Sequence, residues 1–205
     1  YMHSVAICAL MIALARQLEL PDPLVRETLD RIRRCGWAVT AVSDECTCHS
    51  PECEAPDCSF AYTTGLRLHD LPELAVYGLD ARTSASVLNE LGSVFHTYDW
   101  HSIVSNSVPI QLDSLEVPVT VIEMVDKSDL IVTNVLYPDA PVLQAVWPDD
   151  LGSYPSEEGY TLAPEHQFVM GVHDPRAPGG DSPRVIYPHP GMNRAQRRKA
   201  ARRRR

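Results

Sequence analysis

The chain has 205 residues, of which 44% are hydrophobic, enough for one domain with a substantial core. Its net charge of −9 hides an asymmetry: residues 191–205 hold eight basic residues and no acid, whereas residues 1–190 hold ten basic and all 27 acidic residues. An acidic body of this kind repels a phosphate backbone, which excludes the body itself as a nucleic-acid platform.

The chain begins with an apolar segment, and residues 4–20 predict one helix that the prolines of "PDP" at 21–23 end. The uncharged run at 5–15 is too short to span a bilayer. It resembles the hydrophobic region of a secretory signal, but no basic residue precedes it. We therefore expect a buried helix in a cytoplasmic protein without a membrane partner, with export as the alternative.

A second helix follows, in which Asp22 is the expected N-cap, Pro23 the first helical residue and Gly36 the end. A later helix begins near a cap at Thr83 or Ser84. The segment 129–139 predicts a short helix or a linking strand. Runs of β-branched and aromatic residues predict strands at 37–42, 60–66, 73–79, 117–125 and 141–150.

These elements favour an α+β fold: a single domain with a mostly antiparallel sheet and helices packed on one side. The expected parts are an N-terminal extension (1–23), a core domain (24–170) with a cysteine-rich loop (44–58), a Pro- and Gly-rich linker (171–190) and a disordered basic tail (191–205).

The cysteine-rich loop contains "CTCHSPECEAPDC", which holds four of the six cysteines of the chain. Four thiolates satisfy a tetrahedral Zn²⁺, and the acidic residues around them favour a bound cation. Disulfides, which need an oxidising compartment, and a free or redox-sensing loop are the alternatives. The expected ligands of a structural zinc ion are Cys46, Cys48, Cys53 and Cys58.

Four phrases stand in order along the chain: "GWAVTAV", "FAYTTGL", "PELAVYGLD" with "SVLNELG", and "LQAVWPDDLGSYP". In this order and at this spacing they resemble the bacterial and phage family called domain of unknown function 4262, over about residues 24–170. Two positions depart from the family pattern: Cys35 replaces a histidine, and Ser156 replaces a tryptophan. The family carries no established activity, so the resemblance implies a fold and leaves the function open. The matching residues are Gly36-Trp37, Tyr62-Thr63-Thr64-Gly65-Leu66, Pro72-Glu73-Leu74, Leu143-Gln144, and Asp149 or Asp150 with Gly152 and Pro155.

Two of these phrases, "YTTGL" and "WPDDLG", suggest a pocket between them. His69 is a candidate base oriented by Asp70 or Glu73, but a polar loop residue is the alternative. The acidic pair Asp149 and Asp150 suits a metal or a basic partner, and equally an ordinary turn. The residues expected to line the pocket are Tyr62, His69, Glu73, Gln144, Trp147 and Asp149.

The basic tail predicts binding to nucleic acid or to an acidic protein, or else non-specific anchoring. It contains no aromatic residue, so base stacking is not expected. Because the chain lacks glycine-rich phosphate loops and a G-x-S-x-G elbow, we expect no nucleotide cofactor and a non-enzymatic binding module. An enzyme or small-ligand protein with the pocket described above is the alternative. The tail residues expected to bind are Arg194, Arg197, Arg198, Lys199, Arg202 and Arg203.

Overall fold

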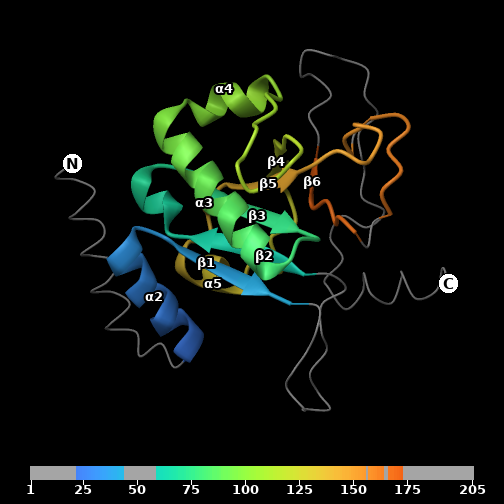
Figure 1. Cartoon of the computed structure of the whole chain (residues 1–205). Coiled ribbons are helices and arrows are strands. Elements are labelled where there is room, and N and C mark those ends of the chain that lie inside the picture. The colour runs from blue at the N-terminus through green and yellow to red at the C-terminus, as the bar shows by residue number, and fades with distance from the viewer. Residues whose placement is uncertain (1–21, 44–58, 156, 164–165, 173–205) are drawn as a thin grey trace, which may run out of the picture.

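The architecture is taken from a computed structural model of the chain. The structure describes residues 22–43, 59–155, 157–163 and 166–172, so the predicted helix at 4–20, the cysteine-rich loop, the basic tail and most of the linker lie outside it. In chain order the elements are α2 (Pro23–Cys35), β1 (Ala38–Val42), β2 (Phe60–Thr64), the 3-10 helix η1 (Leu66–His69), β3 (Glu73–Tyr77), α3 (Ala81–Thr97), α4 (Trp100–Ser105), β4 (Thr120–Met124), α5 (Ile131–Leu136), β5 (Val142–Val146) and β6 (Gly171–Val172) (Figure 1).

The described strands form one six-stranded mixed sheet in the order β1-β2-β3-β5-β4-β6. β3 and β5 run parallel, whereas the other four neighbouring pairs are antiparallel. The parallel pair arises because the chain leaves β3, builds α3, α4 and β4, and then returns through α5 to insert β5 between β3 and β4. The predicted α+β class and mostly antiparallel sheet are therefore confirmed.

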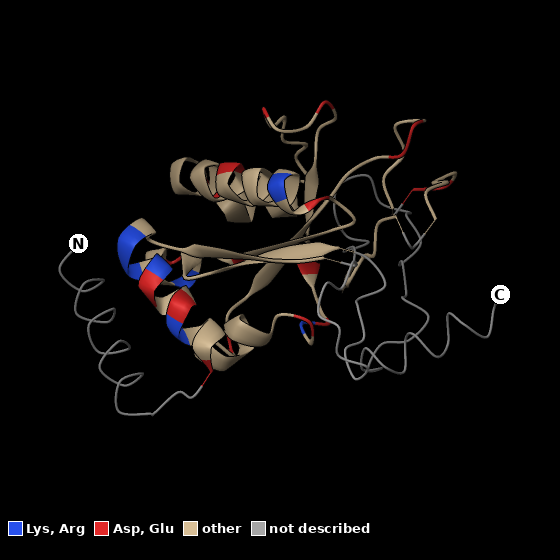
Figure 2. Cartoon of the chain, turned by 60° about the horizontal axis from the view of Figure 1, so that its bottom comes forward, with Lys and Arg blue, Asp and Glu red and all other residues tan. Residues whose placement is uncertain are grey.

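The helices cover both faces of the sheet, and the prediction of helices on one side needs correction (Figure 2). α3 and α4 pack on one face, whereas α2 and α5 pack on the other. The reason lies in the central strands: β2, β3 and β5 are buried at all five positions. A strand without an exposed side needs cover on both faces, as is usual around parallel pairs.

Local sequence signals place the helix ends. The start of α2 is as predicted, because a side-chain oxygen of Asp22 accepts a hydrogen bond from the Leu24 N–H at 2.8 Å and Pro23 follows. α3 begins three residues earlier than expected, because the N-cap is Asp80 and not Thr83 or Ser84. The segment 129–139 contains the short helix α5, whereas α4, which Asp99 caps, was not predicted.

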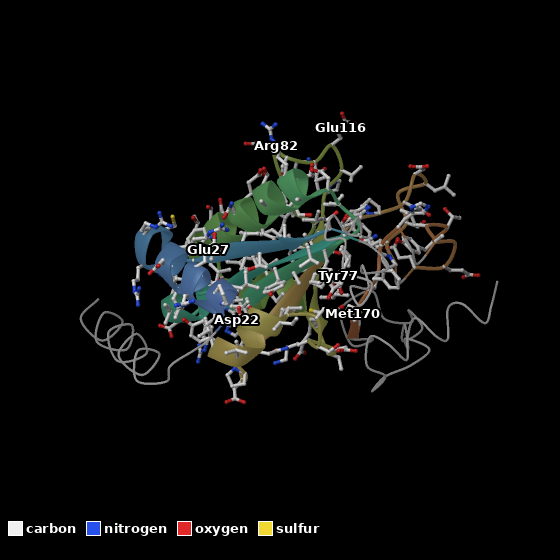
Figure 3. All side chains as sticks on the ribbon, turned by 90° about the horizontal axis from the view of Figure 1, so that it is seen from below. Asp22, Glu27, Tyr77, Arg82, Glu116 and Met170 are labelled. Carbon is white, nitrogen blue, oxygen red and sulfur yellow. The ribbon has the colours of Figure 1, made fainter. Side chains whose placement is uncertain are left out.

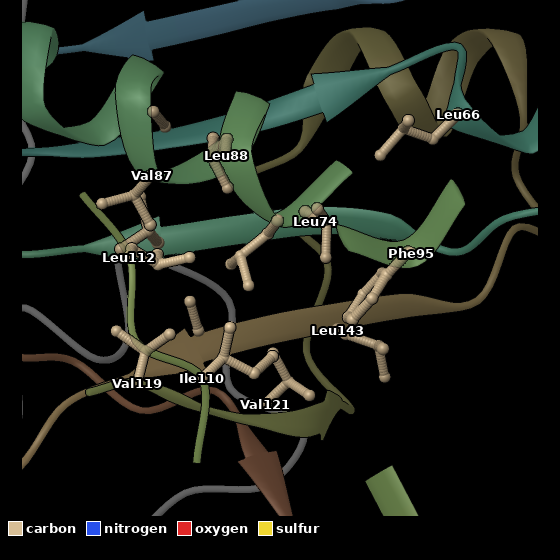
Figure 4. Close-up of a cluster of buried hydrophobic side chains, with 14 of the residues drawn as sticks. Leu66, Leu74, Val87, Leu88, Phe95, Ile110, Leu112, Val119, Val121 and Leu143 are labelled. Atoms are coloured by element: carbon tan, nitrogen blue, oxygen red, sulfur yellow. The ribbon is translucent and has the colours of Figure 1, made fainter. Parts of the chain in front are cut away.

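The larger core cluster lies between α3 and the sheet. Val87, Leu88 and Phe95 of α3 point toward Leu74 of β3 and Leu143 of β5 (Figure 4). Burying a Leu or Phe side chain of this kind contributes about 1.5–3 kcal/mol. This cluster gives the sheet the rigid base on which the connecting loops are held.

The second cluster lies on the opposite face, under α2 and α5. It includes Tyr77 and Met170 (Figure 3), and the rings of Phe60 and Tyr77 stack with centroids 5.2 Å apart. Among the described helices, none is long and apolar enough to cross a membrane.

Candidate functional site

Glu73, the first residue of β3, places a carboxylate in the interior with no exposed surface. One carboxylate oxygen accepts a hydrogen bond from the Thr63 hydroxyl at 2.6 Å. The other accepts from the backbone N–H groups of Gly65 at 2.7 Å and Arg67 at 3.1 Å. Desolvation raises the pKa of Glu73 above its usual range and outweighs these hydrogen bonds, which lower it. The carboxylate therefore holds the turn between β2 and η1 in place.

The same turn joins three of the phrases that carry the family resemblance. The Thr63 hydroxyl, besides donating to Glu73, accepts from the Leu74 N–H at 2.8 Å. Gly65 has φ +116° and lies against the residues that lead into β1. A Cβ at Gly65 would be 3.2 Å from both the Gly36 carbonyl oxygen and the Trp37 Cα. The Gly-Trp, Tyr-Thr-Thr-Gly-Leu and Pro-Glu-Leu phrases thus form one packed unit at one end of the sheet.

Tyr62 lies on the opposite face from the large core cluster, buried with 2% exposure. Its hydroxyl oxygen accepts a hydrogen bond from the Val132 N–H of α5 at 3.4 Å. Burial raises the pKa of this hydroxyl above its usual range, and the Val132 hydrogen bond opposes that effect only in part. Tyr62 therefore helps to dock α5 on the sheet.

Gln144, in the middle of β5, is also buried and fully engaged. Its side-chain amide donates to the Phe168 carbonyl and accepts from the Met170 N–H. The amide thereby pairs with a backbone segment much as a neighbouring strand would. Gln144 anchors the chain that leads into β6.

Asp149 lies in the turn after β5 and is 5% exposed. One carboxylate oxygen accepts from the N–H groups of Leu151 and Ser153 at 2.9 and 3.0 Å. The other accepts from the N–H and the hydroxyl of Thr161, both at 2.7 Å. Desolvation acts to raise the pKa of Asp149, but these hydrogen bonds together outweigh it and lower the pKa below the usual range. This geometry supports the turn interpretation of the Asp-Asp-x-Gly phrase.

Trp147 reaches the neighbouring loop through its backbone. The side chain of Gln167 accepts from the Trp147 N–H and donates to its carbonyl, each at 2.9 Å, and also donates to the Tyr160 hydroxyl at 2.8 Å. Gln167 is 2% exposed, and it was not predicted as a site residue. Its partner Trp147 is 20 residues away in the sequence, and no local sequence pattern indicates a contact over that separation.

The six residues predicted to line a pocket do not gather in one place. Glu73 pairs with Val142 at the start of β5, whereas Trp147 and Asp149 follow the end of that strand. Five residues of strand span roughly 16 Å. His69 lies with Glu73 at one end of the sheet, so the "YTTGL" and "WPDDLG" segments lie at opposite ends of the parallel pair.

An exposed ring cluster forms instead at the end that holds η1. The His69 ring is hydrogen-bonded to a backbone group and not to either predicted carboxylate partner: its Nε2 lies 3.3 Å from the Gly36 carbonyl oxygen. The His96 ring, from α3, lies 5.1 Å from the His69 ring between centroids. Trp37 stacks on His96 at 5.6 Å and meets His69 edge-on at 6.2 Å. The sequence did not single out Trp37 or His96 as members of a site.

The described residues contain no group of three or more His, Cys, Asp or Glu side chains placed to hold a metal ion. The four cysteines of the predicted zinc loop, and the six tail residues, lie outside those residues. Cys35, the family histidine position, is exposed and free at the end of α2.

Comparison with known proteins gives one family and one short similarity. The model of the family described as Domain of unknown function (DUF4262) matches residues 31–161. A cyclic di-GMP phosphodiesterase of Pseudomonas aeruginosa is 96% identical over 27 residues, which cover 13% of this chain and 6% of that protein. The named activity therefore belongs to that relative. No solved structure matches the chain. Because the family model covers well over half of its length, the chain belongs to the DUF4262 family, as its ordered phrases predicted.

Proposed function

We propose that this member of the family is a non-enzymatic binding module whose basic C-terminal segment binds nucleic acid. The observation that carries the proposal is the segregation of charge: eight basic residues in the last 15, against a net charge of −17 for the ten basic and 27 acidic residues before them. Such a segment releases condensed counterions from a phosphate backbone without reading its sequence. The acidic body limits the contact to the tail.

The arrangement of the body supports a binding role over catalysis. Glu73, Gln144 and Asp149 are the buried polar residues that an enzyme would be expected to use, yet each one accepts hydrogen bonds from backbone groups that hold a loop. In Glu73 and Asp149, both carboxylate oxygens accept hydrogen bonds from groups of the chain itself. These contacts favour structural roles for all three side chains.

Duplex DNA binding should fall steeply with salt. With the whole chain, a plot of log K against log salt concentration is expected to have a slope of about −0.9 per phosphate contact. Replacing Arg197, Arg198, Arg202 and Arg203 by Gln removes half of the tail charges and should reduce the slope by about half. Fluorescence anisotropy of a labelled duplex at several salt concentrations measures both quantities.

The matched control removes four charges from the body. Arg26, Arg31, Arg33 and Arg34 are exposed on α2, and two of them pair with acids: Arg31 with Glu27 and Arg33 with Asp30. Replacing these four arginines by Gln should leave DNA binding unchanged. Loss of binding in the α2 variant with retention in the tail variant would show that the body is the platform. Binding of poly-glutamate in preference to DNA would show that the partner is an acidic protein.

We further propose that Cys46, Cys48, Cys53 and Cys58 hold one structural zinc ion. Support comes from the strands on either side, because Val42 of β1 pairs with Phe60 of β2. The two ends of the loop are therefore adjacent in the sheet, which limits how far apart its four cysteines can lie. Two-residue to five-residue connections suffice for a hairpin, so a connection of this length with four thiols suits a metal-stabilised loop.

Elemental analysis of the chain purified under reducing conditions should find about one zinc per molecule, as a four-cysteine site predicts. The Cys46→Ser/Cys53→Ser variant should lose it. Absence of metal, together with fewer than six titratable thiols before reduction, would instead indicate disulfides.

A further inference from the structure

We propose that His69 and His96 form a binding site for a divalent transition-metal ion such as Zn²⁺ or Ni²⁺, with water as the remaining ligands. The two side chains are exposed, and they come from different elements, η1 and α3. Imidazole nitrogen is the preferred neutral ligand for these ions. The site is separate from the cysteine loop and from the tail.

The spacing of the two rings suits a shared ion. Their centroids are 5.1 Å apart and their planes are inclined by 59°. Two imidazoles bound to one tetrahedral ion, with metal–nitrogen distances of about 2 Å, have ring centroids roughly 5 Å apart. The fold therefore holds the two rings at the separation that a shared ion requires.

Each ring also makes the outer contact that is typical of a metal-binding histidine. His69 Nε2 donates to the Gly36 carbonyl oxygen at 3.3 Å, and His96 Nδ1 donates to the Gly92 carbonyl oxygen at 2.8 Å. Metal-ligating histidines almost always donate their other ring N–H to such an acceptor, which fixes the tautomer. The lone pairs are then on His69 Nδ1 and His96 Nε2.

Trp37 fixes the orientation of both rings. It stacks on His96 and meets His69 edge-on, while its own indole N–H donates to the Asn89 side-chain oxygen at 2.9 Å. The indole also lies directly against α3, since a Cβ at Gly92 would be 3.5 Å from it, in ordinary van der Waals contact. Held rings lose little conformational entropy when an ion binds, which favours binding.

The first test is a Ni²⁺ titration of the whole chain carrying Cys46→Ser, Cys48→Ser, Cys53→Ser and Cys58→Ser, so that the loop thiols do not compete. Ni²⁺ should quench the emission of Trp37, and calorimetry should give the affinity. His69→Gln and His96→Gln should each weaken binding about tenfold or more, because each removes one of two protein ligands. Equal affinity in these variants and the parent would overturn the proposal.

His101→Gln is the matched control. His101 is exposed and stacks on Trp100 with ring centroids 3.6 Å apart, so it is also a histidine beside a tryptophan. In the described part of the chain, no second histidine ring packs against it. This variant should bind Ni²⁺ as the parent does. An equal loss of affinity in His101→Gln would show general surface binding and would overturn the assignment to the His69 and His96 pair.

A second readout is independent of the cysteine loop. Two-bond proton–nitrogen NMR spectra of the wild-type chain report which ring nitrogen carries the proton. The proton is expected on Nε2 of His69 and on Nδ1 of His96. Added Zn²⁺ should shift the opposite nitrogens, His69 Nδ1 and His96 Nε2. Failure of both nitrogens to shift would contradict the site.

Discussion

The Glu73→Ala variant is expected to lose about 3 kcal/mol of unfolding free energy, because buried donors left without an acceptor cost about 1–3 kcal/mol each and partial relaxation recovers some of that. The substitution removes the acceptor for the Thr63 hydroxyl and for the N–H groups of Gly65 and Arg67. It also leaves a cavity at a position with no exposed surface. Urea unfolding followed by circular dichroism measures the loss.

The Glu73→Gln variant should lose less unfolding free energy, about 1 kcal/mol. Its amide oxygen still accepts from the N–H groups of Gly65 and Arg67, but its amide nitrogen is not an acceptor for the Thr63 hydroxyl proton. Glu123→Gln makes the same change at an exposed position on β4 and should stay within about 0.5 kcal/mol of the wild type. A Glu73→Ala loss no larger than that of Glu123→Gln would show that the carboxylate does not hold the turn.

The deficit of Glu73→Gln should also shrink as the pH rises. Burial raises the pKa of Glu73 in the folded protein above its ordinary value near 4.5. The stability that this group contributes is then fully present below the ordinary value and is lost as the pH rises through the folded pKa. Glutamine does not titrate, and every other group is common to both proteins. Urea unfolding of the two proteins at pH 4 and pH 8 measures the difference, and a deficit that grows with pH would contradict the predicted direction.

Much of the sheet could be predicted because its strands are runs of β-branched and aromatic residues with clear ends. The same runs also carry information about the layers. "ELAVY" and "VLQAV" are buried on both sides, and near-continuous apolar runs of this kind are typical of strands covered on both faces, a signal that the prediction of helices on one side did not use. The early start of α3 was missed for a simpler reason: Asp80, Thr83 and Ser84 are all suitable caps, and local propensity does not choose among them.

The candidate site could be predicted only in part. Glu73, Gln144 and Asp149 were predicted to line a pocket, and all three are buried polar residues, which need hydrogen-bond partners. Their partners are backbone groups that spacing does not reveal. The ring cluster was missed because Trp37, His69 and His96 meet only after β1, η1 and α3 have folded together. Sequence separation of this size leaves no periodic signal.

The Gly65→Ala variant is expected to lose about 2–3 kcal/mol, and it links the turn to the ring cluster. Gly65 has φ +116°, where an L side chain is strained by about 1–3 kcal/mol. A Cβ there would also lie 3.0 Å from Ile32 and 3.2 Å from the Gly36 carbonyl oxygen and the Trp37 Cα. The added methyl group therefore presses on the connection between α2 and β1 that carries Trp37, so the variant should also change the Trp37 emission.

Gly92→Ala is the matched comparison, because it adds the same methyl group beside the same tryptophan with the opposite expected sign. Gly92 lies inside α3, and its Cβ would be 3.5 Å from both Leu66 and the Trp37 ring, which is ordinary van der Waals contact. Alanine is favoured over glycine in a helix interior by about 0.5–1 kcal/mol, so this variant should be more stable than the wild type. Urea unfolding of both variants measures the two changes in stability. A Gly65→Ala variant as stable as the wild type, or a Gly92→Ala variant less stable than Gly65→Ala, would contradict the packing of Trp37 against these two glycines.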